Sequence, residues 1–166
     1  MILTGKEIKR EYEEGNISIF PFDEIMLNPN SYNYRLSEDL KIFEPVENNG
    51  SRFKSTKIQS EGFVLRPGQM YLGSTFESIG SSRYAMSLIG RSSLGRLGLF
   101  LQLSANLGHT TSNHCWTLEL MATRAIRIYP NMKIGQISFW SCDGEIEKYD
   151  GIYGKMNMPF ESLVAQ

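Results

Sequence analysis

Apolar and polar residues alternate over short stretches along most of this chain, a pattern typical of half-buried β-strands. The clearest stretches are 17–20, 32–36, 63–65, 70–76, 84–89, 99–105, 116–121, 125–129 and 134–140. Turn sequences such as Asn28-Pro29-Asn30-Ser31 and Pro67-Gly68 separate several of them. The polar segment 44–59, around Asn48-Asn49-Gly50, is expected to be a long loop or a loose hairpin. The pattern predicts a mainly β sandwich or barrel.

Only the N-terminal segment has a helical period. Thr4-Gly5-Lys6-Glu7 has the form of a capping box, in which the threonine caps the helix and the glutamate follows three residues later. Ile8 and Tyr12 then lie four residues apart on one face, and Gly15 is a natural C-terminal stop. A short amphipathic helix is therefore expected to open the chain.

The stretch 90–99, Gly-Arg-Ser-Ser-Leu-Gly-Arg-Leu-Gly-Leu, concentrates candidate chemistry between two apolar runs. Arg91 and Arg96 offer planar forks of donors that suit phosphate or carboxylate groups. Ser92 or Ser93 can cap a short helix, whose N-terminus attracts anions. These residues predict an anion-binding turn between two strands. The alternative is an ordinary capped surface turn with solvated arginines.

Glu119 lies in the apolar segment 115–121. Strand alternation places Trp116, Leu118 and Leu120 on one face and Thr117 and Glu119 on the other. A carboxyl group in such a strand is expected to be partly desolvated, and desolvation in general favours the protonated form and so suits proton transfer. The alternative is an exposed glutamate on a half-solvated sheet.

Composition and net charge indicate which kinds of partner and which cellular compartment to expect for this protein. The 166 residues are 41% hydrophobic and carry a net charge of −1, which indicates one domain over residues 1–166 and gives no electrostatic sign of nucleic-acid binding. No apolar run reaches membrane-spanning length, so no membrane association is expected. Cys115 and Cys142 are too few for a disulfide framework, which indicates a cytoplasmic protein.

A metal site has little support in the sequence. His109, His114 and Cys115 are close in the chain, but three ordinary polar residues explain them better than a ligand set does. The chain also lacks the His-x-Glu and Pro-Cys-x-x-Cys pair of zinc-dependent nucleobase deaminases. No zinc is expected.

Taken in order, several segments resemble the dCTP deaminase branch of the dUTPase/dCTP deaminase superfamily. They are 3–8, 17–22, 28–36, 65–77, 90–99, 117–119 and 134–139, and the match over 90–99 is almost letter for letter. The resemblance implies a distorted β-barrel or jelly-roll of the dUTPase type with a short N-terminal helix. It also implies a homotrimer whose active sites lie between subunits.

The resemblance further implies metal-independent hydrolytic deamination of dCTP to dUTP and ammonia, which supplies dUMP and dTTP synthesis. Glu119 would be the general base and acid, with Ser92 and Arg96 orienting the water and the glutamate. Other matched positions would bind the nucleotide, whose phosphates bring Mg²⁺ with them. These are Arg91, Ser93, Ala105 (through its carbonyl), His109, Gln136, Tyr149, Tyr153 and Lys155.

Some positions depart from the family pattern. His109 stands where an aspartate usually contacts the sugar 3′-hydroxyl, and residues 107–114 contain no Asp or Glu. Asn33 replaces another usual aspartate, and Ile152 and Met156 alter the C-terminal segment, where Lys155 could supply the phosphate charge. We therefore expect deamination without appreciable dUTP hydrolysis. The alternatives are a dCMP deaminase, a bifunctional dCTP deaminase/dUTPase and a non-catalytic nucleotide-binding trimer.

Overall fold

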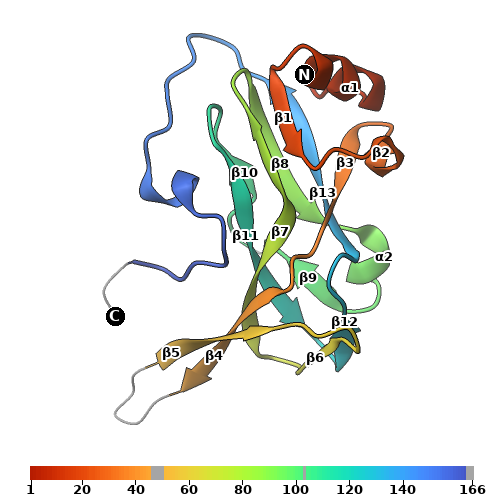
Figure 1. Ribbon diagram of the computed structural model, residues 1–166, viewed down its shortest axis with the longest axis vertical. Coiled ribbons are helices and arrows are strands. Elements are labelled where there is room, and N and C mark those ends of the chain that lie inside the picture. The colour runs from red at the N-terminus through yellow and green to blue at the C-terminus, as the bar shows by residue number, and fades with distance from the viewer. Residues whose placement is uncertain (46–50, 103, 164–166) are drawn as a thin grey trace.

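The computed structural model describes residues 1–45, 51–102 and 104–163 and is built mainly from antiparallel strands (Figure 1). The largest sheet has the order β5-β4-β7-β11-β9, with β1 also paired to β7. Its strands are β1 (Ile17–Phe20), β4 (Asp39–Pro45), β5 (Ser51–Lys57), β7 (Met70–Ser81), β9 (Leu99–Leu101) and β11 (Asn113–Ala122).

The second sheet has the order β10-β8-β13-β3-β2, and a third, small sheet pairs β12 with β6. Their strands are β2 (Leu27–Asn28), β3 (Ser31–Arg35), β6 (Phe63–Leu65), β8 (Tyr84–Gly90), β10 (Leu107–Gly108), β12 (Ile126–Ile128) and β13 (Lys133–Ser141). The helical elements are α1 (Gly5–Glu13), α2 (Ser92–Gly95) and the 3₁₀ turns η1 (Glu24–Met26) and η2 (Ile152–Lys155). Over the described residues the sheets stay open, so the mainly β, distorted fold that we predicted is confirmed without a closed barrel.

The core contains large side chains from both main sheets. Tyr32 and Tyr34 of β3, Phe139 of β13 and Tyr71 of β7 are each at most 1% exposed. Burial alternates along β8 and β13, as it must when one face of a sheet packs inward and the other faces out. The period-2 pattern of the sequence thus identifies the inward faces of these strands.

Most predicted strands are confirmed, and the differences have local causes. The segment 44–59 contains β5 and the end of β4, so it is a hairpin, although Asn48-Asn49-Gly50 lies outside the described residues. The strand predicted over 99–105 is wrong after Leu101, because Gln102 has φ 51° and leaves the extended region; Leu103 of that segment is also outside the described residues. The prediction that Ser92 or Ser93 caps a helix is also wrong, because Arg91 occupies the N-cap without a side-chain bond.

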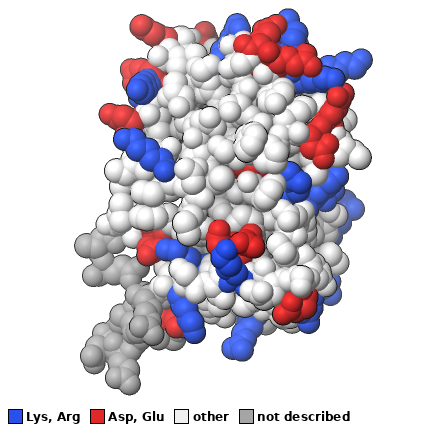
Figure 2. Space-filling view, viewed as in Figure 1, with Lys and Arg blue, Asp and Glu red and all other residues white. Residues whose placement is uncertain are grey.

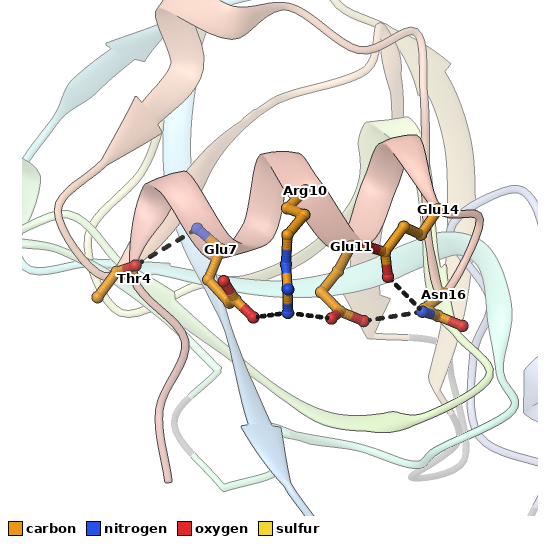
Figure 3. Close-up of polar contacts among 6 residues, drawn as sticks. All are labelled: Thr4, Glu7, Arg10, Glu11, Glu14 and Asn16. Atoms are coloured by element: carbon orange, nitrogen blue, oxygen red, sulfur yellow. Dashed lines mark hydrogen bonds and ion pairs between the residues drawn. The ribbon is translucent and has the colours of Figure 1, made fainter.

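The N-terminal helix forms as predicted, with one change in its cap. The Thr4 hydroxyl accepts a hydrogen bond from the Glu7 N–H at 3.3 Å, but the Glu7 carboxylate pairs with Arg10 instead of returning to the cap (Figure 3). Glu11 is only 1% exposed, and its two carboxylate oxygens accept from Arg10 at 3.1 Å and from Asn16 at 2.9 Å. This charged residue on the inner face is therefore satisfied by hydrogen bonds rather than by water.

Strand β7 bends where its register with β11 changes. Cys115 pairs with Ser78 and Thr117 pairs with Ser74, so three residues of β7 lie opposite one residue of β11. The buried Thr75 hydroxyl accepts from the Trp116 N–H at 2.8 Å and donates to the Glu77 carbonyl at 2.7 Å. One side chain thus satisfies two backbone groups that the irregular pairing leaves without strand partners.

Charged side chains are unevenly distributed over the surface. In the view of Figure 2, Lys, Arg, Asp and Glu gather toward the two ends and the rims, and the middle of the face carries few of them. Cys115 and Cys142 are free thiols. In the described part of the chain, none of the helices is long and apolar enough to cross a membrane.

Candidate functional site

A pocket of about 610 Å³ lies along the edge of β11 that β9 leaves uncovered. Several elements line it: the β4–β5 hairpin, the start of β7, β8, the segment after β9, β11 and residues 149–162, which we call the C-terminal segment. The described lining residues are Phe43, Phe53, Met70, Leu72, Leu88, Gln102, Ala105, Asn106, Leu107, His109, Ser112, His114, Trp116, Thr117, Glu119, Tyr149, Tyr153, Gly154, Met156, Phe160 and Ser162. Just over half of these residues are apolar or aromatic, and the polar groups among the rest determine what the pocket can do chemically.

Glu119 is the only carboxylate among these described lining residues. It lies on β11 between Leu118 and Leu120, which are fully buried, and its own side chain is half-buried. The strand alternation that we predicted is therefore confirmed, and it turns Glu119 toward the pocket rather than onto a solvated sheet face. Ser104 lies within hydrogen-bond distance of the Glu119 carboxylate, at 3.4 Å.

Gln102 connects Glu119 to Ala105. The Glu119 N–H donates to the Gln102 side-chain oxygen at 2.8 Å, and the Gln102 side-chain nitrogen donates to the Ala105 carbonyl at 2.9 Å. The Gln102 N–H also donates to the Glu119 carbonyl at 3.2 Å. The structure thus brings together two predicted site residues, Glu119 and Ala105, through a third that the sequence analysis did not identify.

The C-terminal segment runs along one side of the molecule (Figure 1), and several of its residues line this pocket. The ring of Tyr149 stacks on His109, with centroids 4.7 Å apart and planes 19° apart. The Tyr149 N–H donates to the Thr111 hydroxyl at 2.8 Å, and the Phe160 N–H donates to Thr117 at 3.2 Å. The predicted residues His109, Tyr149 and Tyr153 therefore all line the pocket that contains Glu119.

His114 and Cys115 have structural contacts. The His114 ring lies 4.1 Å from the Trp116 ring, and its Nδ1 is 3.0 Å from the Cys115 carbonyl. Burial lowers the pKa of His114 and raises the pKa of the Cys115 thiol. Within the described residues, no three His, Cys, Asp or Glu side chains are grouped so that they could hold a metal ion.

The other predicted residues lie elsewhere on the subunit. Ser92, Ser93 and Arg96 are exposed on α2 and its C-cap, and Arg91 is half-buried at the N-cap. In Figure 1, α2 and the C-terminal segment lie on opposite sides of the sheets. None of these four residues is among the described residues that line the pocket, and neither is the exposed Lys155.

Gln136 lies on β13 at the end of a hydrogen-bonded network, also away from the pocket lining. The Ser31 hydroxyl donates to its side-chain oxygen at 2.8 Å, and Asn28 donates to Ser31 at 3.1 Å. The buried Asn33 amide donates to the Met26 carbonyl and to the Asn28 side chain, both at 3.1 Å. An ionised aspartate could donate neither bond, which explains why an amide suits position 33 in this chain.

Sequence reasoning missed Gln102, His114, Phe43 and Phe160 as pocket residues. His114 is on the predicted inner face of β11 and reaches the pocket because the strand edge is open there. Gln102 had no distinguishing signal, since its left-handed backbone is set by tertiary contacts. Phe43 and Phe160 are brought in by chain segments far from Glu119 in the sequence.

Comparisons with known proteins agree with these motifs. The model of the dCTP deaminase-like family matches residues 2–142. A protein named "dCTP deaminase, dUMP-forming" from Hathewaya histolytica is 44% identical over 155 residues, covering 90% of this chain and 88% of its own. A protein of the same name from Leptospira biflexa serovar Patoc is 42% identical and covers 90% and 87%. A "dCTP deaminase" from Rhodopirellula baltica is 41% identical and covers 87% and 74%.

A crystal structure of 2′-deoxycytidine 5′-triphosphate deaminase from Agrobacterium tumefaciens has a similar fold, with a TM-score of 0.66 and 21% identity. The match covers 83% of this chain but 47% of that chain, so this chain spans about half of the length of that neighbour.

Proposed function

Since this chain belongs to the dCTP deaminase-like family, we propose that it hydrolytically deaminates dCTP to dUTP and ammonia. Water adds to C4 of the cytosine ring, the bond between C4 and the amino nitrogen breaks, and the nitrogen leaves as ammonia. The observation that carries the proposal is the presence of Glu119 as the single carboxylate among the described residues that line the pocket.

Glu119 can serve both proton transfers that this reaction needs. Its carboxylate takes a proton from the attacking water and delivers it to N3. It then takes the second proton, from the C4 hydroxyl of the adduct, and delivers it to the departing amine. The Ala105 carbonyl is linked to the Glu119 backbone through Gln102 and can accept a hydrogen bond from the water or the base. The apolar walls of the pocket limit access of other water and strengthen these polar contacts.

We propose that Ser92 and Arg96 complete the site from a neighbouring copy of this chain. The separation of α2 from the C-terminal segment supports this arrangement (Figure 1), because one subunit does not bring Ser92 and Arg96 into the pocket lining. A homotrimer would pair the α2 of one subunit with the Glu119 pocket of the next, with Ser92 and Arg96 orienting the water and the carboxylate.

A feature of the second sheet supports self-association. Between residues 85 and 89 of β8 and between residues 136 and 140 of β13, the outward-facing residues are Ala85, Ser87, Ile89, Gln136, Ser138 and Trp140, which we call the uncharged outer face. Ile89 and Trp140 are each 44% exposed. An uncharged sheet surface with exposed large apolar side chains is typical of a surface that another protein covers.

The nucleotide would extend from the pocket toward cationic groups. Arg91 and Ser93 of α2, with Lys155, are placed to meet the phosphates in such an assembly, while Tyr149 and Tyr153 border the sugar. Gln136 remains a proposed nucleotide-binding residue on the basis of the family pattern, although its side-chain oxygen already accepts a hydrogen bond from Ser31. Mg²⁺ belongs to the substrate as a counterion of the triphosphate, and no zinc is required for the proton transfers of Glu119.

The product distinguishes two candidate activities. The names of the Hathewaya and Leptospira proteins favour formation of dUMP. Residues 107–114 of this chain contain no Asp or Glu, and His109 is stacked on Tyr149 where the family pattern has an aspartate. Since that carboxylate would orient the hydrolytic water, we propose dUTP as the main product and dUMP formation as the second candidate.

The test is to incubate the purified protein with dCTP, dCMP and dUTP separately, after transition metals have been removed by chelation and Mg²⁺ restored. We expect dUTP and ammonia from dCTP, and little turnover of the other two. Formation of dUMP and pyrophosphate from dCTP would favour the second candidate. Binding of dCTP without any product would show a nucleotide-binding protein instead, and activity lost on chelation and recovered with Zn²⁺ would refute the metal-independent reaction.

A further inference from the structure

Gln102 is one of three non-glycine residues with positive φ in the described chain, and the only one of them that lines the pocket. Its φ of 51° lies in the left-handed region, which non-glycine residues other than Asn and Asp seldom occupy. Such a conformation persists only when surrounding contacts hold it, and it is concentrated at functional sites. Gln102 therefore calls for an explanation in terms of what it holds in place.

The contacts of Gln102 extend the β9–β11 pairing beyond the end of β9. Regular pairing stops at Leu101, yet the Gln102 N–H still donates to the Glu119 carbonyl at 3.2 Å. The side-chain oxygen of Gln102 then takes the place of a strand carbonyl and accepts from the Glu119 N–H at 2.8 Å. Glu119 thus has both of its backbone groups bound by one residue.

The remaining group of the same side chain holds the Ala105 carbonyl, through a donated hydrogen bond of 2.9 Å. The two side-chain bonds require one orientation of the amide, with its oxygen toward Glu119 and its nitrogen toward Ala105. The backbone of Glu119 and the Ala105 carbonyl are therefore linked by one side chain, which is neither a proton carrier nor a phosphate ligand.

We infer that Gln102 is a positioning residue that aligns the Ala105 carbonyl with the Glu119 carboxylate. This inference rests on the proposed deamination, because those two groups are the ones that contact the water and the base. Removing the donated bond lets the Ala105 carbonyl turn away, and a misplacement of about 1 Å at a reacting centre costs on the order of 10²-fold in rate.

The test compares Gln102→Glu with wild type in the dCTP assay. The new carboxylate keeps the acceptor for the Glu119 N–H and loses the donor to Ala105. We expect kcat to fall about 10- to 100-fold with KM changed less than about threefold. On protonation the new carboxyl group regains an O–H donor, so the ratio of variant to wild-type kcat should rise between pH 8 and pH 5.5.

Gln69→Glu is the matched control, because the Gln69 side chain also accepts one bond, from Tyr71 at 2.9 Å, and donates another to a carbonyl, that of Phe43 at 3.0 Å. Gln69 lies outside the described pocket lining. The kcat of the Gln69→Glu variant should therefore stay within about twofold of wild type at every pH. Gln102→Gly provides a second variant that suits the positive φ. It should fold and melt near the wild-type temperature and still lose kcat.

The outcomes separate this inference from the proposed function. A wild-type protein that does not deaminate dCTP overturns the proposed function, and the alignment role falls with it. An active wild type with kcat of Gln102→Glu within threefold and a flat pH ratio overturns the alignment role alone. If Gln102→Glu does not fold, a kcat of Gln102→Gly equal to that of wild type overturns the alignment role of Gln102.

Discussion

Glu119 is the residue on which the proposed chemistry depends most directly. We expect Glu119→Gln to lower kcat for dCTP by about 10² to 10⁴-fold, because glutamine keeps the shape of the side chain but cannot carry a proton. Ammonia release measures the effect, and circular dichroism with dCTP binding shows that the fold and the pocket are retained. Turnover within tenfold of wild type would mean that another group transfers the protons.

His109 combines two features that a pair of variants can separate. His109→Asp introduces a carboxylate toward the sugar, whereas His109→Asn removes the Tyr149 stack without adding charge. A charge-assisted hydrogen bond is roughly twice as strong as a neutral one, so we expect the KM for dCTP to be about 3- to 10-fold lower in His109→Asp than in His109→Asn. An equal or higher KM in His109→Asp would contradict a sugar contact at this position.

His114 should make stability depend on pH. Burial holds its pKa in the folded protein below the ordinary value of 6.5, so the unfolded chain binds the proton more readily. The contribution to stability is therefore complete above about pH 6.5 and is lost as the pH falls below that value. We expect the free energy of unfolding to drop more steeply from pH 7.5 to 5 in wild type than in His114→Gln. Urea denaturation at several pH values measures how the free energy of unfolding depends on pH in both proteins. The same dependence in wild type and His114→Gln would show that His114 does not cause it.

At the scale of elements, the bend of β7 depends on the Thr75 hydroxyl. Thr75→Val keeps the shape of the side chain but leaves the Trp116 N–H and the Glu77 carbonyl without their buried partner. We expect it to cost about 1–3 kcal/mol of unfolding free energy. Thr75→Ser keeps the hydroxyl and loses one methyl group, at a cost of about 0.8 kcal/mol. Urea titrations that find the valine variant as stable as the serine variant would show that the hydroxyl does not hold the bend.

At the scale of the whole molecule, the uncharged outer face is expected to be buried between copies of the chain. Ile89→Glu places a charge on this face, so it should shift the mass measured by light scattering from a trimer toward a monomer. Ile146→Glu is the control: Ile146 is similarly exposed, at 41% against 44%, but lies between Glu145 and Glu147. A monomeric wild type at micromolar concentration, or a trimer that Ile89→Glu leaves intact, would contradict this use of the face.

The sequence by itself determined which residues face inward and which family pattern the chain carries. Period-2 alternation located the strands around Tyr84 and Ile134, and Thr4 marked the start of α1, because these features depend on neighbours in the chain. The stretch 90–99 identified the family for the same reason, because its motif is a run of neighbouring residues that can be read directly from the sequence. Glu119 could be selected because it interrupts an apolar strand, although alternation could not tell a pocket from solvent on its outer side.

Tertiary structure alone decided which of these residues meet. The C-terminal segment reaches the pocket through contacts such as the bond from the Cys115 N–H to Asn157, 42 residues apart in the chain, and no local pattern encodes such a distance. The same holds for Gln102, whose left-handed backbone is maintained by Glu119 and Ala105 rather than by its own preference. Strand order also put α2 and the C-terminal segment on opposite sides (Figure 1), which separates Ser92 from Glu119 within one subunit. Local sequence sets the face that a side chain takes, but the partner across from it depends on how distant strands pair.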